Sequence, residues 1–115
     1  MIAALLFALS ASAAPPQAEA RQAPAHLSSY IADADYPALA IARGEEGTVE
    51  FELGISAAGL PSDCRVTRSS GSQLLDETTC RLLVERARFR PARDRAGRPV
   101  PDRVTSRIRW VLPPR

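Results

Sequence analysis

Two cysteines, Cys64 and Cys80, are the residues best suited to covalent chemistry in this chain of 115 residues. Their spacing matches no metal-binding signature, and the only histidine, His26, lies in a separate stretch rich in proline and alanine. Two interpretations stay open at this point: a disulfide, or two small core residues that pack without bonding. The sequence predicts no metal site and no cofactor.

Side chains that could act in catalysis have simpler structural explanations. The Ser69–Gly71 motif reads as a turn and cap before a helix, and a serine nucleophile there would lack a base because His26 stands alone. Asp76 and Glu77 fall in the first turn of that helix, where the helix dipole favours negative charge. The chain has no glycine-rich phosphate loop. We therefore expect no catalytic residue and no enzymatic activity.

The element that positions Cys80 is an amphipathic helix within Ser69–Ala92. Ser72 is expected to cap its start, and Pro91 prevents its continuation. One broad arc is expected to face a core and the opposite arc to face water. The inner arc comprises Leu75, Thr79, Cys80, Leu82, Leu83, Val84 and Ala87, and the outer arc comprises Glu77, Thr78, Arg81, Glu85 and Arg88.

Three segments alternate with the period of two that is typical of half-buried strands. They are Thr48–Ser56, Leu60–Ser69 and Arg103–Leu112. Ala57-Ala58-Gly59 is a turn that joins the first two segments as a hairpin. The expected inward side chains are Val49, Phe51, Leu53 and Ile55; then Leu60, Cys64 and Val66; then Val104, Ser106, Ile108, Trp110 and Leu112.

A second, shorter helix is expected at Tyr36–Ala42, with Asp35 as its cap, Pro37 in its first turn and Gly44 at its end. Its inward residues are expected to be Ala38, Ile41 and Ala42.

The order of these elements predicts an α+β fold. A helical crossover between the second and third strands makes them parallel, so the third strand fits beside the first. The result is a three-stranded antiparallel/mixed sheet of order 2-1-3, with two helices on one face and water on the other. Pro99 and Pro101 bar a central strand before Arg103, and no fourth strand is expected.

In this arrangement Cys64 of the second strand and Cys80 of the helix point into the same layer. A bond between them would close a loop of about 15 residues and contribute roughly 3 kcal/mol. A small domain benefits from such a covalent link, so a Cys64–Cys80 disulfide is predicted for an oxidising compartment.

The first residues point to such a compartment. Residues 1–14 combine an apolar core with an Ala-x-Ala pattern at Ala11–Ala13, as in a secretory signal peptide. A membrane anchor, or a start codon placed too far downstream, is the alternative, although an apolar run of about 14 residues is short for a span. Residues 15–35 read as a linker rich in proline and alanine, and residues 36–112 as one domain. The net charge of +2 is too small to indicate nucleic-acid binding.

Short motifs in a fixed order carry a family resemblance between Tyr36 and Leu112. They are Tyr36-Pro37, Gly47, the alternating Val49-Phe51-Leu53-Ile55, Gly59, Ser69-Ser70-Gly71, Leu75-Asp76, Phe89-Arg90-Pro91-Ala92, Gly97-Arg98-Pro99-Val100 and Ile108-Arg109-Trp110-Val111-Leu112. Each motif is weak alone, but the order and gaps together are specific. In these motifs the chain resembles the C-terminal domain of TonB, the energy transducer of Gram-negative bacteria.

The resemblance implies a periplasmic binding module that captures the TonB box of outer-membrane transporters as an added strand beside its last strand. Inner-membrane motor proteins would be further partners if an anchor is present, and strand exchange could give a homodimer. The edge that binds the peptide would consist of Arg103, Val104, Thr105, Ser106, Arg107, Ile108, Arg109 and Trp110.

Two features differ from a full transducer. The anchor is uncertain, and a linker of about 20 residues spans at most roughly 70 Å. The alternative function is therefore a stand-alone envelope adaptor of the same fold, structural or regulatory, which would not transduce energy.

Three groups of residues have both a functional and a structural interpretation. Arg103, Arg107 and Arg109 form either a basic surface for an acidic or anionic partner, or a solvated face that protects an edge strand from aggregation. Trp110 is expected in the core, where its indole N–H needs a partner. Tyr36-Pro37 is expected to start the short helix and pack on the core, although this region lies near the partner in the family.

Overall fold

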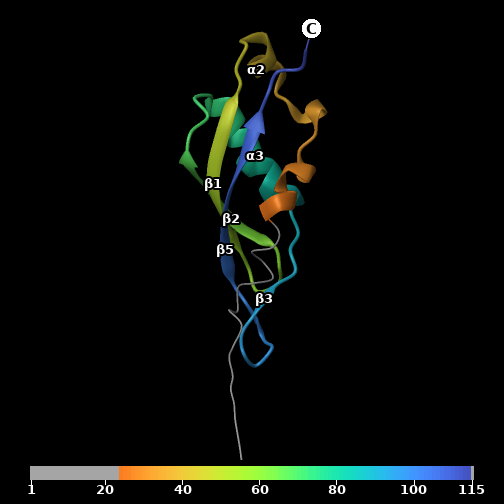
Figure 1. Cartoon of the computed structure of the whole chain (residues 1–115), viewed down its shortest axis with the longest axis vertical. Helices are drawn as coiled ribbons and strands as arrows, with labels where there is room; N and C mark the ends of the chain where they lie inside the picture. Colours follow the sequence, from red (N-terminus) through yellow and green to blue (C-terminus); the bar gives the residue numbers. More distant parts are fainter. Residues whose placement is uncertain (1–23, 115) are drawn as a thin grey trace, which may run out of the picture.

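Strand β1, Gly47–Ile55, forms the centre of a three-stranded sheet in the computed structural model, which describes residues 24–114. Strand β2, Pro61–Arg68, lies on one side of β1, and β5, Asp102–Trp110, lies on the other. Both pair antiparallel with β1. The predicted strand order and the parallel relation between the two outer strands are confirmed (Figure 1).

Helix α3, Gln73–Arg86, packs on one face of this sheet. The 3-10 helix η1, Pro24–Tyr30, packs against β5 and α3, and η2, Asp33–Asp35, leads on to the short helix α2, Ala38–Ala42. Two short strands, β3 at Ala92–Arg93 and β4 at Pro99–Val100, form a separate hairpin that was not predicted. Figure 1 shows α2 at one end of the domain and this hairpin at the other.

The core forms between α3, η1 and the inner face of the sheet. The alternation predicted for β1 and β5 is confirmed, and the buried set from these strands is Val49, Phe51, Leu53, Ile55, Val104, Ile108 and Trp110. Cys64 and Val66 of β2 are half-buried and pack against the same cluster. Leu60, by contrast, is 45% exposed, because β2 begins one residue later and Leu60 closes the turn by accepting a hydrogen bond from Ser56 N–H.

The buried face of α3 is rotated slightly about the helix axis from the face predicted from the sequence. Thr78 is buried rather than exposed, and Val84 is exposed rather than buried. The buried stripe follows the i, i+3, i+4, i+7, i+8 pattern of a helix on a flat sheet: Leu75, Thr78, Thr79, Leu82 and Leu83. The helix also ends at Arg86, so Arg88 lies beyond it.

Helix α2 differs from its prediction in both cap and orientation. Its N-cap position is Pro37, and Ala40 is its buried residue. Asp35 does not cap it, because the Asp35 carboxylate accepts hydrogen bonds from Ala32 N–H and from Arg86. The residues predicted to face inward, which are Ala38, Ile41 and Ala42, are exposed.

The packed part of the chain begins before the predicted domain boundary at residue 36. Leu27 of η1 is buried in the main core cluster, and Tyr30 packs against it. The Tyr30 hydroxyl donates to the Arg88 carbonyl, 3.0 Å away, and accepts from Arg88 N–H. Residues 27–35, assigned to the linker from sequence, therefore contribute to the folded unit. The predicted signal peptide or anchor lies outside the described residues.

Candidate functional site at the edge of the sheet

Strand β5 presents one paired edge and one edge without a strand neighbour among residues 24–114. Its register with β1 is continuous from Gly47 opposite Trp110 to Ile55 opposite Asp102. The strand predicted to accept a partner is thus an edge strand over its full length.

The direction of the backbone groups of β5 follows from a hydrogen bond at the end of β1. Ser56 N–H donates to the Leu60 carbonyl, 2.8 Å away, on the β2 side. Backbone directions alternate along a strand, so odd-numbered residues of β1 direct their groups to β5. Their register partners are even-numbered, from Asp102 to Trp110. The odd-numbered residues of β5 therefore direct N–H and C=O groups to the open edge, namely Arg103, Thr105, Arg107 and Arg109.

The start of this edge is closed by its own neighbour. Arg103 N–H donates to Asp102 Oδ1 at 2.8 Å. The first backbone N–H of this edge that is open for pairing is consequently that of Thr105.

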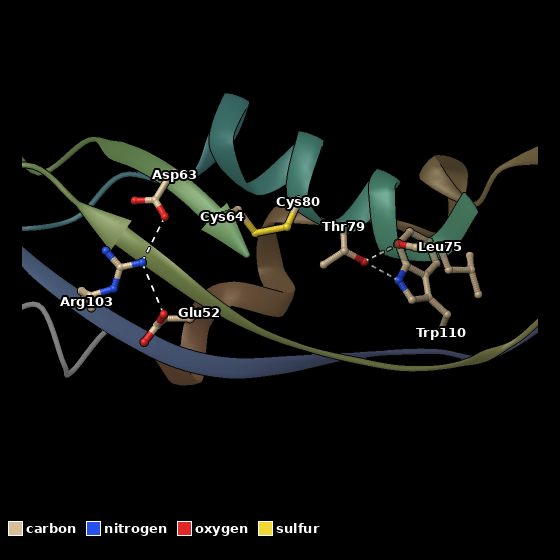
Figure 2. Close-up of a disulfide and its surroundings, with 8 residues drawn as sticks. All are labelled: Glu52, Asp63, Cys64, Leu75, Thr79, Cys80, Arg103 and Trp110. Carbon is tan, nitrogen blue, oxygen red and sulfur yellow. Dashed lines mark hydrogen bonds and ion pairs between the residues drawn. A yellow bond between two sulfur atoms is a disulfide. The ribbon is translucent and has the colours of Figure 1, made fainter. Parts of the chain in front are cut away.

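The side chains of β5 that face inward anchor the edge to the helix. The Trp110 indole N–H donates to Thr79 Oγ1 at 2.8 Å, and the Thr79 hydroxyl donates to the Leu75 carbonyl at 2.7 Å (Figure 2). The Tyr36 ring meets Trp110 edge to face, with centroids 5.1 Å apart. The core position predicted for Trp110 is confirmed, and its indole partner is Thr79.

Tyr36 is held at both ends. Its ring is buried and its hydroxyl donates to the Glu45 carbonyl. Burial raises the pKa of this hydroxyl, and the negative charges of Glu46 and Glu45 raise it further. Tyr36 therefore stays protonated as a donor and fixes the chain entering α2.

The outer face of the sheet carries a charge network around Arg103. Arg103 Nη2 lies 3.0 Å from Asp63 Oδ2 and 3.4 Å from Glu52 Oε1 (Figure 2). Arg65 lies 2.8 Å from the same Glu52 carboxylate. Hydrogen bonds from Arg65 to Glu52 and from Arg103 to Asp63 are the main causes that lower the pKa values of these carboxyls. Arg103 thus links all three strands across their solvent face.

The three arginines grouped by the sequence prediction have different surroundings. Arg103 is engaged with two carboxylates, whereas Arg107 and Arg109 are exposed and stand opposite Glu50 and Thr48 in the register. Within residues 24–114, neither Arg107 nor Arg109 forms an ion pair with a carboxylate. Any basic recognition surface on β5 therefore lies toward its C-terminal half.

The segment before α2 flanks the C-terminal end of β5. A cavity of about 110 Å³ lies between the two. Arg86 fixes this segment through a paired contact with Asp35, 2.7 and 2.9 Å, and a third bond to the Tyr30 carbonyl. The cavity is lined by Ser28, Ile31, Ala32, Asp33, Tyr36, Ile108, Arg109, Trp110 and Val111. Sequence reasoning missed this neighbour of the edge, because nothing in the local pattern of residues 28–33 signals a long-range contact.

A disulfide joins Cys64 of β2 to Cys80 of α3, with Cα atoms 5.6 Å apart (Figure 2). It links the helix to the strand farthest from the candidate site. Of the two interpretations that the sequence left open, the structure has the bonded one.

The serine and acidic residues near the start of α3 form a cap. Ser69 and Ser70 hydroxyls donate to the two oxygens of Asp76, at 2.6 and 2.8 Å. Burial alone would raise the pKa of Asp76, but these hydrogen bonds outweigh it and lower the pKa. Ser72 Oγ accepts from Leu75 N–H at 3.2 Å, as predicted for the cap. These groups serve the helix start, and residues 24–114 contain no acidic, histidine or cysteine cluster that could hold a metal ion.

The arrangement defines a class: a small α+β domain with one helix-covered antiparallel sheet whose last strand has an open edge. Residues 32–112 match the family described as Gram-negative bacterial TonB protein C-terminal. The chain belongs to the TonB C-terminal domain family. Domains of this family serve energy transduction in transport and are not enzymes, which agrees with the absence of activity expected from the sequence.

Similar proteins include Protein tonB2 of Pseudomonas aeruginosa, 44% identical over 59 residues. That match covers 51% of this chain and 22% of the relative, so the chain corresponds to a minor part of that protein's length. The solution structure of the Pseudomonas aeruginosa TonB CTD is 29% identical, with a TM-score of 0.58, over 70% of this chain and 79% of that one.

The fold is also that of the Helicobacter pylori TonB-CTD, solved as residues 179–285. This likeness has a TM-score of 0.60 at 20% identity and covers 90% of this chain and 100% of that one. Domains of the family are typically periplasmic and generally interact with TonB-dependent outer-membrane receptors. Every helix within residues 24–114 is too short or too polar to cross a bilayer.

Proposed function

We propose that this domain captures an extended segment, the TonB box, of an outer-membrane transporter by adding it as a strand to β5. The domain would act in this way on the periplasmic side of TonB-dependent transport. The observation that carries the proposal is the open edge of β5, where Thr105, Arg107 and Arg109 direct their backbone groups away from β1. Strand addition obtains affinity from such groups and selectivity from alternate side chains.

The supports of β5 suit this role because they hold the edge before a partner arrives. Trp110 is fixed by Thr79, and Arg103 is fixed by Asp63 and Glu52. An accepting strand that is already ordered loses little conformational entropy on binding. The extent of the added strand is limited at both ends. The N–H of Arg103 is engaged by Asp102, and the segment of residues 28–36 flanks the region from Ile108 to Val111. We expect pairing to centre on Thr105–Arg109.

The experiment is an amide-resolved NMR titration of residues 24–115 with TonB-box peptides from transporters of the source bacterium. All buried residues of the core cluster lie between Leu27 and Trp110, so this piece contains the contacts described above. Shifts concentrated on Thr105–Arg109 support the proposal. Absence of shifts at millimolar peptide, with a folded domain, contradicts it.

A pair of N-methylated peptides tests strand addition itself. A strand beside β5 uses every second backbone N–H for pairing, so methylating one parity of peptide amides should abolish binding. Methylating the other parity is the matched control and should leave affinity nearly unchanged. Equal loss with both peptides would mean that the segment binds in another way.

A further inference from the structure

The hairpin at the far end of the domain concentrates positive charge. We define the arginine hairpin as residues 88–98, which include β3 and the turn that leads into β4. Asp94 is its only acidic residue. Its five arginines are all exposed, and they are Arg88, Arg90, Arg93, Arg95 and Arg98. The hairpin therefore carries far more charge than the +2 of the whole chain would suggest.

Asp94 builds the turn and forms an ion pair with only one of the five arginines, Arg98. Its Oδ1 accepts from Ala96 N–H and Arg98 N–H, both at 2.9 Å. Its carbonyl accepts from Gly97 N–H, and its other oxygen lies 3.8 Å from Arg98 Nε. Within residues 24–114, no carboxylate pairs with Arg90 or Arg95. Their guanidinium groups remain available to an external anion.

Negative charge gathers in another part of the domain. Between Asp33 and Glu52 there are six acidic residues and one arginine, Arg43. Two of the acidic residues, Glu45 and Glu46, directly precede β1 at the α2 end, opposite the arginine hairpin in Figure 1. The α2 end thus carries mixed charge, because Arg107 and Arg109 of β5 also lie toward it, whereas the arginine hairpin is almost uniformly positive. A negatively charged plane attracts the arginine hairpin more strongly than the mixed α2 end, which favours one orientation of the domain.

We propose that the arginine hairpin docks the domain on an anionic phospholipid surface. It projects beyond the end of the three-stranded sheet (Figure 1), so its turn can approach a flat surface without obstruction by the sheet. Guanidinium groups bind phosphate in a bidentate manner, and each basic residue near an anionic bilayer strengthens binding about fivefold. The inference does not depend on strand addition, because the edge at Thr105–Arg109 lies on a different part of the domain.

The test measures co-sedimentation of residues 24–115 with lipid vesicles. One set contains phosphatidylcholine alone, and the other contains about one-third phosphatidylglycerol, which gives a strongly anionic surface. We expect binding to the anionic vesicles only, and weaker binding as NaCl is raised. The triple variant R90Q/R95Q/R98Q should bind roughly 100-fold more weakly, since three basic contacts are lost.

The matched control is R43Q/R68Q/R81Q, which removes the same charge from exposed sites outside the arginine hairpin. It should retain binding within about fivefold, because net charge alone gives a weak, diffuse attraction. Thermal melting of both variants verifies folding, and the peptide titration of the hairpin variant should match that of the native domain.

Three results would overturn the inference. Equal binding to neutral vesicles would exclude an electrostatic surface. Equal weakening in both triple variants would assign the effect to net charge rather than to the hairpin. The last result is displacement of the domain from the vesicles by a poly-glutamate peptide of matched charge. If soluble headgroup phosphate does not compete at the same concentrations, this displacement would indicate an acidic protein partner.

Discussion

The indole N–H of Trp110 on the edge strand donates to the Thr79 hydroxyl of α3 at 2.8 Å, and both side chains are buried. This bond connects the strand proposed to accept a partner with the helix that covers the sheet. A buried donor left without an acceptor is costly. This hydrogen bond therefore stabilises the fold and also fixes the position of β5 relative to α3.

Replacing Thr79 with valine should destabilise the domain by about 1–3 kcal/mol, because the Trp110 N–H would lose its buried acceptor. Urea denaturation of the native domain and T79V measures the loss. The control T67V changes an exposed threonine of β2 and should stay within about 0.5 kcal/mol. In a W110F background the cost of T79V should fall, and an unchanged cost would show that the hydrogen bond is not the cause.

Removing the Cys64–Cys80 bond should cost about 3 kcal/mol, because the bond closes a loop with a sequence separation of 16 in the unfolded chain. Urea midpoints with and without reductant measure the change, and the C64A/C80A variant should be insensitive to reductant. Alkylation followed by intact mass provides a direct check. Labelling of both thiols without prior reduction would contradict the bond.

The regular parts of the fold were predictable because burial on one side leaves a periodic signal. Val49, Phe51, Leu53 and Ile55 alternate along β1, and the same parity recurs at Val104, Ile108 and Trp110. Such alternation determines which face is buried and, with the helical crossover, the strand order. The disulfide followed from the same reasoning, since it required only that strand and helix face the same layer.

The contacts around the candidate site were less predictable because they are not periodic. Leu27 is one of only two large aliphatic side chains in a segment rich in proline and alanine, yet it is buried in the core. The β3–β4 hairpin has only two residues per strand, too few for a pattern. The difference between Arg103 and Arg107 does not follow from strand register alone, because Arg107 stands opposite Glu50 without pairing with it, whereas Arg103 reaches Glu52 and Asp63 diagonally across the sheet.

A glycine near the turn should tolerate substitution poorly because of a close approach. Gly59 has φ +82°, and an added Cβ would lie 2.1 Å from the Phe89 carbonyl oxygen. G59A should therefore cost about 2–5 kcal/mol from backbone strain and overlap together. G97A is the matched control, since Gly97 has the same φ with nothing within 4 Å of its added Cβ, and should cost only about 1–2 kcal/mol. Equal melting temperatures for the two variants would contradict the close approach.

The segment before α2 should loosen in acid. Hydrogen bonds from Arg86 and from Ala32 N–H lower the pKa of Asp35 from 3.8 to about 2. A carboxyl with a depressed pKa in the folded state contributes stability above its unfolded pKa, and the contribution is lost as pH falls from about 4 to 2. NMR titration of the Asp35 carboxyl and hydrogen exchange of residues 28–36 over this range measure the effect. D35N should remove the pH dependence of the protection factors, which are corrected for the intrinsic acid and base catalysis of exchange, and a native-like dependence in D35N would assign it to another group.

The two arginines Arg103 and Arg107 should differ in peptide binding, if strand addition occurs as proposed. Arg103 is engaged with Asp63 and Glu52, whereas Arg107 is exposed, and within residues 24–114 no carboxylate pairs with it. For an acidic peptide, R107Q should weaken affinity about three- to tenfold and reduce its salt dependence, as expected for a charge at the rim of an interface. R103Q should change affinity less than about twofold, since its charge is already neutralised.

Isothermal titration at low and moderate salt, with a charge-reversed peptide as control, separates the two interpretations of the outer arginines. Loss of affinity confined to R107Q means that the C-terminal half of β5 reads the charge of the partner. No loss in either variant, with strand addition intact, means that these arginines are a solvated face that protects the edge from aggregation. Greater loss in R103Q would contradict the division of roles, because it would require Arg103 to leave Asp63 and Glu52 for the peptide.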